Sequence, residues 1–297
     1  MNLSVIPISL NIHTQEAETA AIDWGWNFGI VDDEHILKSE KVLWLAGYAL
    51  PDLDKFHLEE VTKFFFCLYT LDELLEDCTY EDAMEFFHRW EEYLFYQDFE
   101  SPFSSLWYAL DNALEKMETF SDQEWRDTLW FYLDDYMQAR RWEYCNVKEG
   151  IIPGMNLFIM QRSYSSGIYL ASHFLKLNYP AEEYPILWVE QRVARIICLS
   201  SDLKAFQFHR KTQNNHNELV LRQLHTGVSD AEIIRHALNS LSLLFKNLIE
   251  MIQELTNNNK SLTTWTDQLM LLLGGYLYWS EENTLRYGTT VNGINKT

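Results

Sequence analysis

The sequence predicts an all-α fold, a bundle of about ten helices. Glycine and proline are sparse, at 11 and 6 of 297 residues, and they cluster. Only Pro102 falls between Pro51 and Gly150, and neither residue type occurs within 186–224 or 228–273. Stretches this long without helix breakers suit long helices and leave little room for β-hairpins. The second observation is the spacing of apolar residues, which repeats at helical intervals.

The clearest helix follows Ser229. Ser229 and Glu232 form a capping box, in which each side chain satisfies a backbone amide at the start of a helix. The asparagines of 257–259 predict its end. Between these limits, apolar residues recur at alternating steps of four and three, the stripe of a helix packed against others. They are Ile234, Leu238, Leu241, Phe245, Leu248, Ile252 and Leu255.

A second capping box, Ser121 with Glu124, predicts a helix that begins there and runs through Trp125, Leu129 and Tyr132. No linker, repeat or low-complexity segment divides the chain, so we expect one domain. The domain spans 1–297, and its other helices are expected at 57–77, 80–98, 104–119, 155–176, 183–210 and 261–280.

The composition is that of a globular protein with a core, since 47% of the residues are hydrophobic and 23% are charged. Aromatic residues are abundant, with 11 Trp, 16 Tyr and 17 Phe. Most of these rings belong in a core, and a surplus could also line an apolar cavity. The net charge of −21 argues against binding to nucleic acid or to an anionic membrane surface. Any phosphate-bearing ligand must therefore be held locally, by metal ions or by a few basic residues.

The cysteines predict free thiols in a reducing compartment, because the four are scattered and form no CxxC pair. Residues 1–20 have neither a basic start nor a long apolar run, so no signal peptide is expected. No stretch approaches the roughly 18 consecutive apolar residues of a membrane-spanning helix. We therefore expect a cytoplasmic protein without a membrane partner.

One face of the helix predicted at 57–77 carries both apolar and acidic residues. Val61, Phe65 and Leu68 continue into Asp72 and Glu76. Carboxylates at this spacing repel each other on a helix, and burying them is costly unless a cation compensates. Magnesium suits such a pair, because it takes one or two carboxylates together with water and substrate phosphates. The alternative is a solvated acidic helix end, which is common and which this segment alone favours.

The segment FFFCLYTLDELLED resembles the aspartate-rich DDxx(D/E) motif of class I terpene synthases, the microbial terpene cyclase family. The resemblance implies magnesium ligands at Asp72, Glu73 and Glu76, although Glu73 stands where the family has a second Asp. It also implies an α-helical bundle around a central aromatic cavity. The residues expected to line this cavity are Phe65, Phe66, Tyr69 and Trp279.

The resemblance extends along nearly the whole chain. The segment WGWNFGIV near Trp24 is similar to the family's N-terminal Trp segment. The stretch WEYCNVKEGIIPGMNLFIMQRSYSSG resembles the family's run from a WE pair, through a Pro, to an Arg that senses diphosphate, which implies this role for Arg162. Ser165 and Ser166 would then be the linker and the effector at a helix break, and the effector acts through its backbone carbonyl. The spacing to Gly167 departs slightly from the common bacterial pattern.

Near the C-terminus, YWSEENTLRYG resembles the family's Trp followed by an Arg-Tyr pair. The resemblance implies that Arg286 and Tyr287 donate hydrogen bonds to diphosphate oxygens and that Trp279 presents its π face to a carbocation. The interval from Trp279 to Arg286 is slightly longer than in the family. Without the resemblance, Arg286 is an ordinary surface arginine.

The family's second metal motif is degenerate in this chain. The family places Asn, Ser and Glu at the first, fifth and ninth positions of a helix segment, and NNHNELVLRQLHTGVSDAE is similar to the family's segment just after this motif. The motif therefore lies on SSDLKAFQFHRK, where Ser201, Ala205 and His209 replace the three ligands. Alanine cannot coordinate a metal, and histidine suits magnesium less than a carboxylate does. The metal ligands that remain possible here are Ser201, Asp202 and His209.

Two basic residues, Arg210 and Lys211, come directly after the degenerate motif. One interpretation is direct contact with the diphosphate, because the missing ligands leave a site with less positive charge. A solvated basic end of the helix is an equally good interpretation.

The resemblance implies a class I terpene synthase, which uses Mg²⁺ to ionise a linear prenyl diphosphate, farnesyl or geranylgeranyl diphosphate, and cyclises the allylic cation. It also implies a homodimer. Two alternatives stay open. A prenyl diphosphate synthase needs two aspartate-rich motifs, and Asp134 with Asp135 makes a poor second one because Gln138 takes the fifth position. A non-catalytic descendant of the fold would explain the degenerate second motif.

Overall fold

A computed structural model of the chain describes residues 6–92, 101–180, 183–212 and 214–284. All regular secondary structure within these ranges is helical, so the predicted all-α class is confirmed. The helices are α1 (Thr14–Phe28), α2 (Glu34–Glu40), α3 (Trp44–Ala49), α4 (Lys55–Asp77), α5 (Tyr80–Glu91), α6 (Ser104–Met117), α7 (Gln123–Glu149), α8 (Met155–Ser165), α9 (Ile168–Leu175), α10 (Glu183–Lys211), α11 (Glu218–Thr226), α12 (Asp230–Asn258) and α13 (Thr263–Tyr278). Two short segments, η2 (Lys260–Leu262) and η3 (Trp279–Asn283), flank α13.

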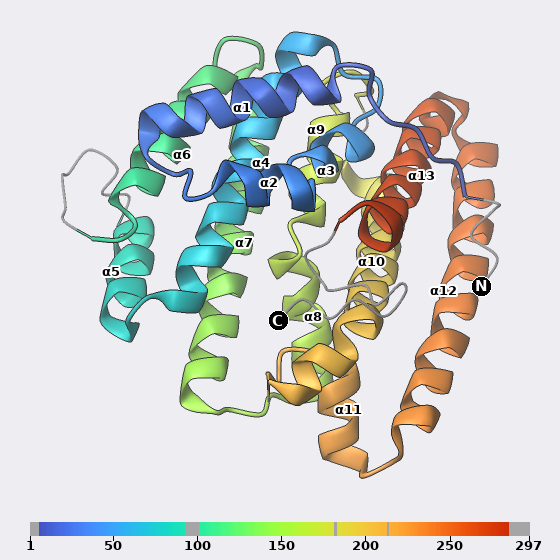
Figure 1. The fold of residues 1–297 in the computed structure, drawn as a ribbon. Coiled ribbons are helices and arrows are strands. Elements are labelled where there is room, and N and C mark those ends of the chain that lie inside the picture. Colours follow the sequence, from blue (N-terminus) through green and yellow to red (C-terminus); the bar gives the residue numbers. More distant parts are fainter. Residues whose placement is uncertain (1–5, 93–100, 181–182, 213, 285–297) are drawn as a thin grey trace.

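The long helices form a bundle that α1 crosses at one end (Figure 1). The helix α4 packs against α1 and α6, and α7 packs against α8. The helix α10 packs against α12 on one side and also contacts α8, α11 and α13. The helix α8 thus joins α7 to α10, and an ion pair between Asp72 and Arg140 links α4 to α7.

The core of the bundle is rich in aromatic side chains. Trp90, Trp107 and Trp265 are each 1% exposed, and they come from α5, α6 and α13. Buried apolar residues from α1 through α13 form one contiguous cluster. Many of the aromatic residues therefore fill the core, as their large apolar area favours. None of the described helices has the length and apolar character required to cross a membrane.

The helix α12 begins and ends where predicted. The Ser229 hydroxyl accepts a hydrogen bond from the Glu232 amide at 3.3 Å, and the helix ends at Asn258. Its buried face differs in part from the predicted stripe, since Leu238 is 43% exposed. Because α12 stands at the edge of the bundle, only a narrow line of its surface is covered. This line consists of Ile233, Ala237, Leu241 and Leu248.

The start predicted for α7 is wrong by one residue. Asp122 caps this helix, because its carboxylate accepts a hydrogen bond from the Trp125 amide at 2.9 Å. The Ser121 hydroxyl donates instead to the Met117 carbonyl at the end of α6, at 2.6 Å. Serine and aspartate are both good caps, but the serine hydroxyl is hydrogen-bonded to the preceding helix.

The helix predicted at 155–176 is divided in two. The helix α8 ends at Ser165, and α9 begins at Ile168. Between them Gly167 has a φ of 71°, in the left-handed region that glycine enters with little strain. The break places Ser166 at the carboxyl end of α8. The helix predicted at 80–98 ends at residues 93–98, which lie outside the described residues.

Candidate active site

The carboxylate of Asp72 is paired with a guanidinium of its own chain. Asp72 lies near the end of α4, and 37% of its side chain is exposed. Its Oδ1 lies 2.8 Å from Nη2 of Arg140 and accepts a hydrogen bond from the Tyr136 hydroxyl at 3.3 Å. Glu73 is partly buried and Glu76 is exposed on the same helix. The first predicted metal ligand therefore faces α7.

Arg140 links Asp72 to a second carboxylate. Its Nη1 donates to Oε2 of Glu143 at 2.7 Å, and Oε1 of Glu143 lies 3.3 Å from Nδ1 of His216. Burial alone would raise the pKa of Glu143, but Arg140 and His216 outweigh it and hold this pKa well below its usual value. Glu143 is therefore ionised and shares the guanidinium with Asp72.

Arg162 and Asp202 form another ion pair, between α8 and α10. Nε and Nη2 of Arg162 donate to Oδ1 of Asp202 at 3.2 and 3.1 Å, and the Asp202 side chain is 1% exposed. Its Oδ2 accepts a hydrogen bond from the Glu218 amide at 2.9 Å, at the start of α11. Burial raises the pKa of Asp202, and the charge of Arg162 opposes this rise. Asp202 thus depends on Arg162 to stay ionised.

The other residues of the degenerate motif lie on α10 beside this pair. Ala205 is 3% exposed and offers no donor atom to a metal, and Ser201 is partly buried. Nδ1 of His209 lies 3.2 Å from Nδ2 of Asn217. The amide nitrogen can only donate, so Nδ1 accepts and the ring is neutral. Burial first, and then the charge of Arg162, lower the pKa of His209 to about 4.

Acid should destabilise the fold through His209. The pKa of this residue falls from an ordinary 6.5 to about 4 on folding, so the unfolded chain takes up a proton first as the pH falls. The loss of stability begins near pH 6.5, grows as the pH falls, and is complete below about pH 4. Between pH 7 and pH 5 it should amount to about 1–2 kcal/mol, with allowance for solvent that reaches the ring.

Urea unfolding at the two pH values measures this effect. The His209→Gln variant should lose less stability on acidification than the wild type, by that amount. The control is His236→Gln, because His236 is 58% exposed on α12, and it should follow the wild type. Equal losses in all three proteins would show that His209 is protonated as easily in the folded chain as in the unfolded one.

The two motifs fit a divalent cation unevenly. Asp72, Glu73 and Glu76 offer the carboxylate oxygens that magnesium prefers. Asp72 and Asp202 are each paired with an arginine, but Asp72 is 37% exposed, whereas Asp202 of the second motif is 1% exposed. No three His, Cys, Asp or Glu side chains within the described ranges are arranged to hold a metal ion. The first motif therefore fits a cation whose other ligands are water and phosphate oxygens, and the second motif offers fewer protein oxygens to one.

The predicted effector and the other residues predicted to bind the diphosphate are spread over the bundle. Ser166 follows α8, and its hydroxyl donates to the Ser163 carbonyl at 2.7 Å. Arg210 and Lys211 are exposed at the end of α10, where Arg210 forms an ion pair with Asp230 of α12. The remaining two, outside the described residues, are Arg286 and Tyr287.

The aromatic residues of α4 lie in different surroundings. Phe65 contacts Phe174 of α9, with the ring centroids 5.8 Å apart. Phe66 is fully buried against α1, where a Cβ at Gly25 would lie 2.6 Å from its ring. Tyr69 is partly buried, and its ring centroid lies 6.5 Å from that of Phe66. Phe65 thus packs against α9, and Phe66 packs against α1.

Trp279 stands at the start of η3. The side chain is 4% exposed, and its Nε1 donates to the Lys41 carbonyl at 2.7 Å. Its ring centroid lies 6.1 Å from that of Tyr276. The indole is therefore held in a defined orientation between α13 and the end of α2.

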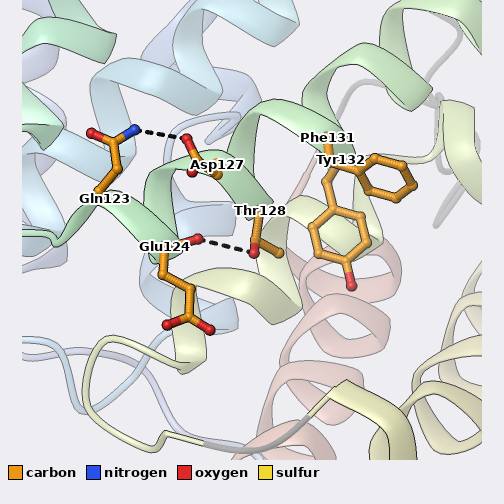
Figure 2. Close-up of a pocket in the computed structure, with 6 residues that line it drawn as sticks. All are labelled: Gln123, Glu124, Asp127, Thr128, Phe131 and Tyr132. Carbon is orange, nitrogen blue, oxygen red and sulfur yellow. Dashed lines mark hydrogen bonds between the residues drawn. The ribbon is translucent and has the colours of Figure 1, made fainter.

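A hollow of about 650 Å³ lies along the first turns of α7 (Figure 2). Its lining residues are Gln123, Glu124, Asp127, Thr128, Phe131 and Tyr132. Two of these side chains hydrogen-bond to each other, since Nε2 of Gln123 donates to Asp127 at 2.7 Å. The lining contains two carboxylates and no basic side chain. The hollow therefore does not suit a diphosphate, and it shares no residue with the polar cluster around Arg140.

Sequence reasoning alone misses three members of that cluster, namely Arg140, Glu143 and His216. The signal that could have found two of them is spacing. Tyr136, Arg140 and Glu143 recur at steps of four and three, which is a polar helical face on α7. His216 lies between α10 and α11, and no periodicity points to it.

A family model described as terpene synthase family 2, C-terminal metal binding, matches residues 63–246 of the chain. The match extends from α4 into α12 and includes Asp72, Arg162 and the degenerate motif on α10. A comparison with curated proteins finds no match.

Solved structures with the same arrangement of helices are terpene synthases of low sequence identity. A variant of cucumene synthase has a TM-score of 0.78 at 15% identity, with 93% of this chain and 97% of that chain covered. Linalool/nerolidol synthase from Streptomyces clavuligerus has a TM-score of 0.77 at 13% identity, with 93% and 98% covered. Hedycaryol synthase has a TM-score of 0.77 at 16% identity, with 93% and 96% covered. The likeness establishes the shared fold.

Proposed function

We propose that this chain, which belongs to the terpene synthase family, is a magnesium-dependent terpene cyclase. Its substrate is a linear prenyl diphosphate, either farnesyl or geranylgeranyl diphosphate. The observation that carries the proposal is that Asp72 pairs with the half-buried Arg140, on which the charge of a second half-buried arginine, Arg162, also acts. Carboxylates that suit a divalent cation and guanidiniums that suit phosphate oxygens lie together there, in a chain whose net charge is −21.

The residues of this site divide the work of ionisation. Asp72, Glu73 and Glu76 hold Mg²⁺, which when bound neutralises the charge that develops on the diphosphate. Arg162 donates hydrogen bonds to the leaving diphosphate, and the Ser166 carbonyl stabilises the allylic cation. The C–O bond breaks with its electron pair on the diphosphate. The cation then closes onto a double bond and loses a proton or takes up water, while aromatic side chains limit the access of solvent.

Other residues extend the proposed site. Trp279 offers its π face to the cation. Arg210 and Lys211 add positive charge near the diphosphate, and Arg286 and Tyr287 donate hydrogen bonds to it. The family resemblance also supports a homodimer and a cytoplasmic location. The mass of the protein in solution at high concentration tests the dimer.

An assay of the purified chain tests this function. The protein is incubated with Mg²⁺ and with geranyl, farnesyl or geranylgeranyl diphosphate in turn. Gas chromatography with mass spectrometry should find a cyclic product from one of them, and a chelator should abolish it. A chain that releases no diphosphate from any of these substrates would rule the function out.

A non-catalytic role is the second candidate, and one observation favours it. Ala205 provides no metal ligand, and Asp202 is engaged by Arg162. A prenyl diphosphate synthase has weaker support, because Asp134 accepts a hydrogen bond from Nε1 of Trp90 on α5 at 2.9 Å. The same assay separates the three, since a synthase would lengthen the chain when isopentenyl diphosphate is added.

The degenerate motif predicts an unusual demand for magnesium. Because Ala205 and His209 supply no carboxylate or hydroxyl oxygen, a cation at this motif must take more of its ligands from the diphosphate and water than in the family. Activity should therefore persist but need more Mg²⁺ than is usual in the family. The triple variant Ser201→Asn, Ala205→Ser, His209→Glu should lower the Mg²⁺ concentration for half-maximal turnover by about 10-fold, which corresponds to one recovered ligand interaction.

Kinetic titration with Mg²⁺ at saturating substrate measures this requirement. The control is Gln207→Glu, because position 207 is exposed on the same helix and the change adds the same charge away from the three replaced ligand positions. The control should leave the requirement unchanged. A triple variant with an equal or higher requirement would mean that these positions do not meet the metal.

A further inference from the structure

Arg140 has an unusual set of partners for a helix residue. Its side chain is 15% exposed and lies between two carboxylates, at 2.8 Å from Asp72 and 2.7 Å from Glu143. Its Nε is buried and donates to no acceptor within the described residues. A buried donor without an acceptor is rare and costly, so its presence calls for an explanation. One explanation is an acceptor that arrives with a ligand.

The surroundings of Arg140 suit an anion. Burial alone would lower its pKa, but Asp72 and Glu143 raise it, so the guanidinium is permanently charged. Arg162 lies near enough to oppose part of this rise, so two guanidiniums share one region of the bundle. A guanidinium presents donors in a planar fork that matches the oxygens of phosphate groups.

The position of Arg140 also affects the cation. As long as its Nη2 pairs with Oδ1 of Asp72, a divalent ion that binds this carboxylate must compete with the positive charge of the guanidinium. The exposed part of Asp72 leaves room for such an exchange, since 37% of the side chain is exposed. The neighbouring carboxylate, Glu143, gives Arg140 a partner that it can keep throughout.

We propose that Arg140 is a diphosphate-binding residue that occupies the Asp72 carboxylate when no substrate is bound. The diphosphate accepts hydrogen bonds from Arg140, including from Nε, and Asp72 becomes available to the metal. This inference rests on the proposed function, and it makes anion and cation binding support each other. By thermodynamic linkage, each ligand then strengthens the other by the same factor.

Binding of inorganic pyrophosphate and of Mn²⁺, measured separately, tests the proposal. Pyrophosphate is titrated by calorimetry without metal, and Mn²⁺ is titrated without pyrophosphate through the electron paramagnetic resonance signal of the free ion. The variant is Arg140→Gln, and the matched control is Arg141→Gln. Arg141 is the next residue on α7, is 37% exposed and pairs with Glu91.

The two ligands should respond in opposite directions. Arg140→Gln should weaken pyrophosphate binding by about 10- to 100-fold, the value of one hydrogen bond to a charged group. It should strengthen Mn²⁺ binding several-fold, because Asp72 loses its competing cation. Arg141→Gln should change neither. A purely structural role for Arg140 would weaken both ligands together or leave both unchanged, and either result would overturn the proposal.

A second variant covers the case in which Arg140→Gln does not fold. Arg140→Lys keeps the charge but loses the planar fork, so it should weaken pyrophosphate binding while Mn²⁺ binding stays as in the wild type. Unchanged pyrophosphate binding in this variant would also overturn the proposal. These results are separate from the test of the proposed cyclase activity. If the variants bind pyrophosphate normally while the wild type still cyclises a prenyl diphosphate, only the role of Arg140 fails.

Discussion

Replacing Asp72 by asparagine is expected to lower turnover of the prenyl diphosphate by about 10³-fold or more, because the metal that assists ionisation contributes several kcal/mol to the transition state. Asparagine keeps the size of the side chain but removes the charge that a divalent cation requires. The fold should survive. Asp72 is 37% exposed, and the loss of its ion pair with Arg140 should cost about 1 kcal/mol or less.

Steady-state turnover and thermal melting of Asp72→Asn measure both parts of this prediction. The matched control is Asp77→Asn, because Asp77 is exposed at the end of the same helix. It should keep the activity and the melting temperature of the wild type. An Asp72→Asn variant that stayed active and became more stable would identify Asp72 as an ordinary acidic residue of the surface.

The loss of Arg140's partner could also explain a fall in activity, and a double variant separates the two causes. If Asp72 acts as a metal ligand, Asp72→Asn should be slower than Arg140→Gln at saturating substrate, because Arg140→Gln keeps this ligand, and the double variant should be no faster than Asp72→Asn. If the only function of Asp72 were to hold Arg140, then Arg140→Gln alone would reproduce the whole effect. The comparison therefore assigns the loss to the carboxylate or to the guanidinium.

Much of the fold could be predicted because the signals are local. The long stretches without glycine or proline predict α4, α7, α10 and α12, and the cap at Ser229 locates the start of α12. The start of α7 could not be predicted to the residue, since Ser121 and Asp122 both make good caps. The choice between them depends on a hydrogen bond from Ser121 to the previous helix, at Met117.

The site could be predicted only in part. The sequence singles out Asp72 and Arg162 through their motifs, but it does not reveal what each carboxylate or guanidinium touches. Arg140 and Arg141 are adjacent and identical in type, and the sequence offers no reason to separate them. In the fold one is 15% exposed between two carboxylates, and the other is 37% exposed and pairs with Glu91. Burial of this kind depends on which helices pack together.

The ion pair of Arg162 with Asp202 also depends on which helices pack together. Breaking it should destabilise the fold more than breaking the pair of Arg140 with Asp72. Asp202 is 1% exposed, and its other described partner is the Glu218 amide at Oδ2. Replacing Arg162 by methionine leaves this carboxylate buried without a counter-charge, and it must be protonated or hydrated. The expected cost is about 3–5 kcal/mol in the free energy of unfolding, the range for one broken partner of a buried pair.

Arg162→Met together with Asp202→Asn should recover most of that stability. Asparagine carries no charge, and its side-chain oxygen can still accept the hydrogen bond from the Glu218 amide. Urea unfolding of the wild type, both single variants and the double variant gives the coupling energy of the pair. A double variant no more stable than Arg162→Met would mean that the charge of Asp202 is not the cause of the loss.

Turnover measured on the same four proteins separates the structural role of Arg162 from its proposed role at the diphosphate. If Arg162 acts only by holding Asp202, the double variant should regain activity along with stability. If Arg162 also donates hydrogen bonds to the leaving diphosphate, the double variant should be folded, stable and still about 10²-fold slower or worse, because those donors act when charge develops on the oxygens. We expect the second result, since no uncharged side chain at this position can replace a guanidinium for phosphate oxygens.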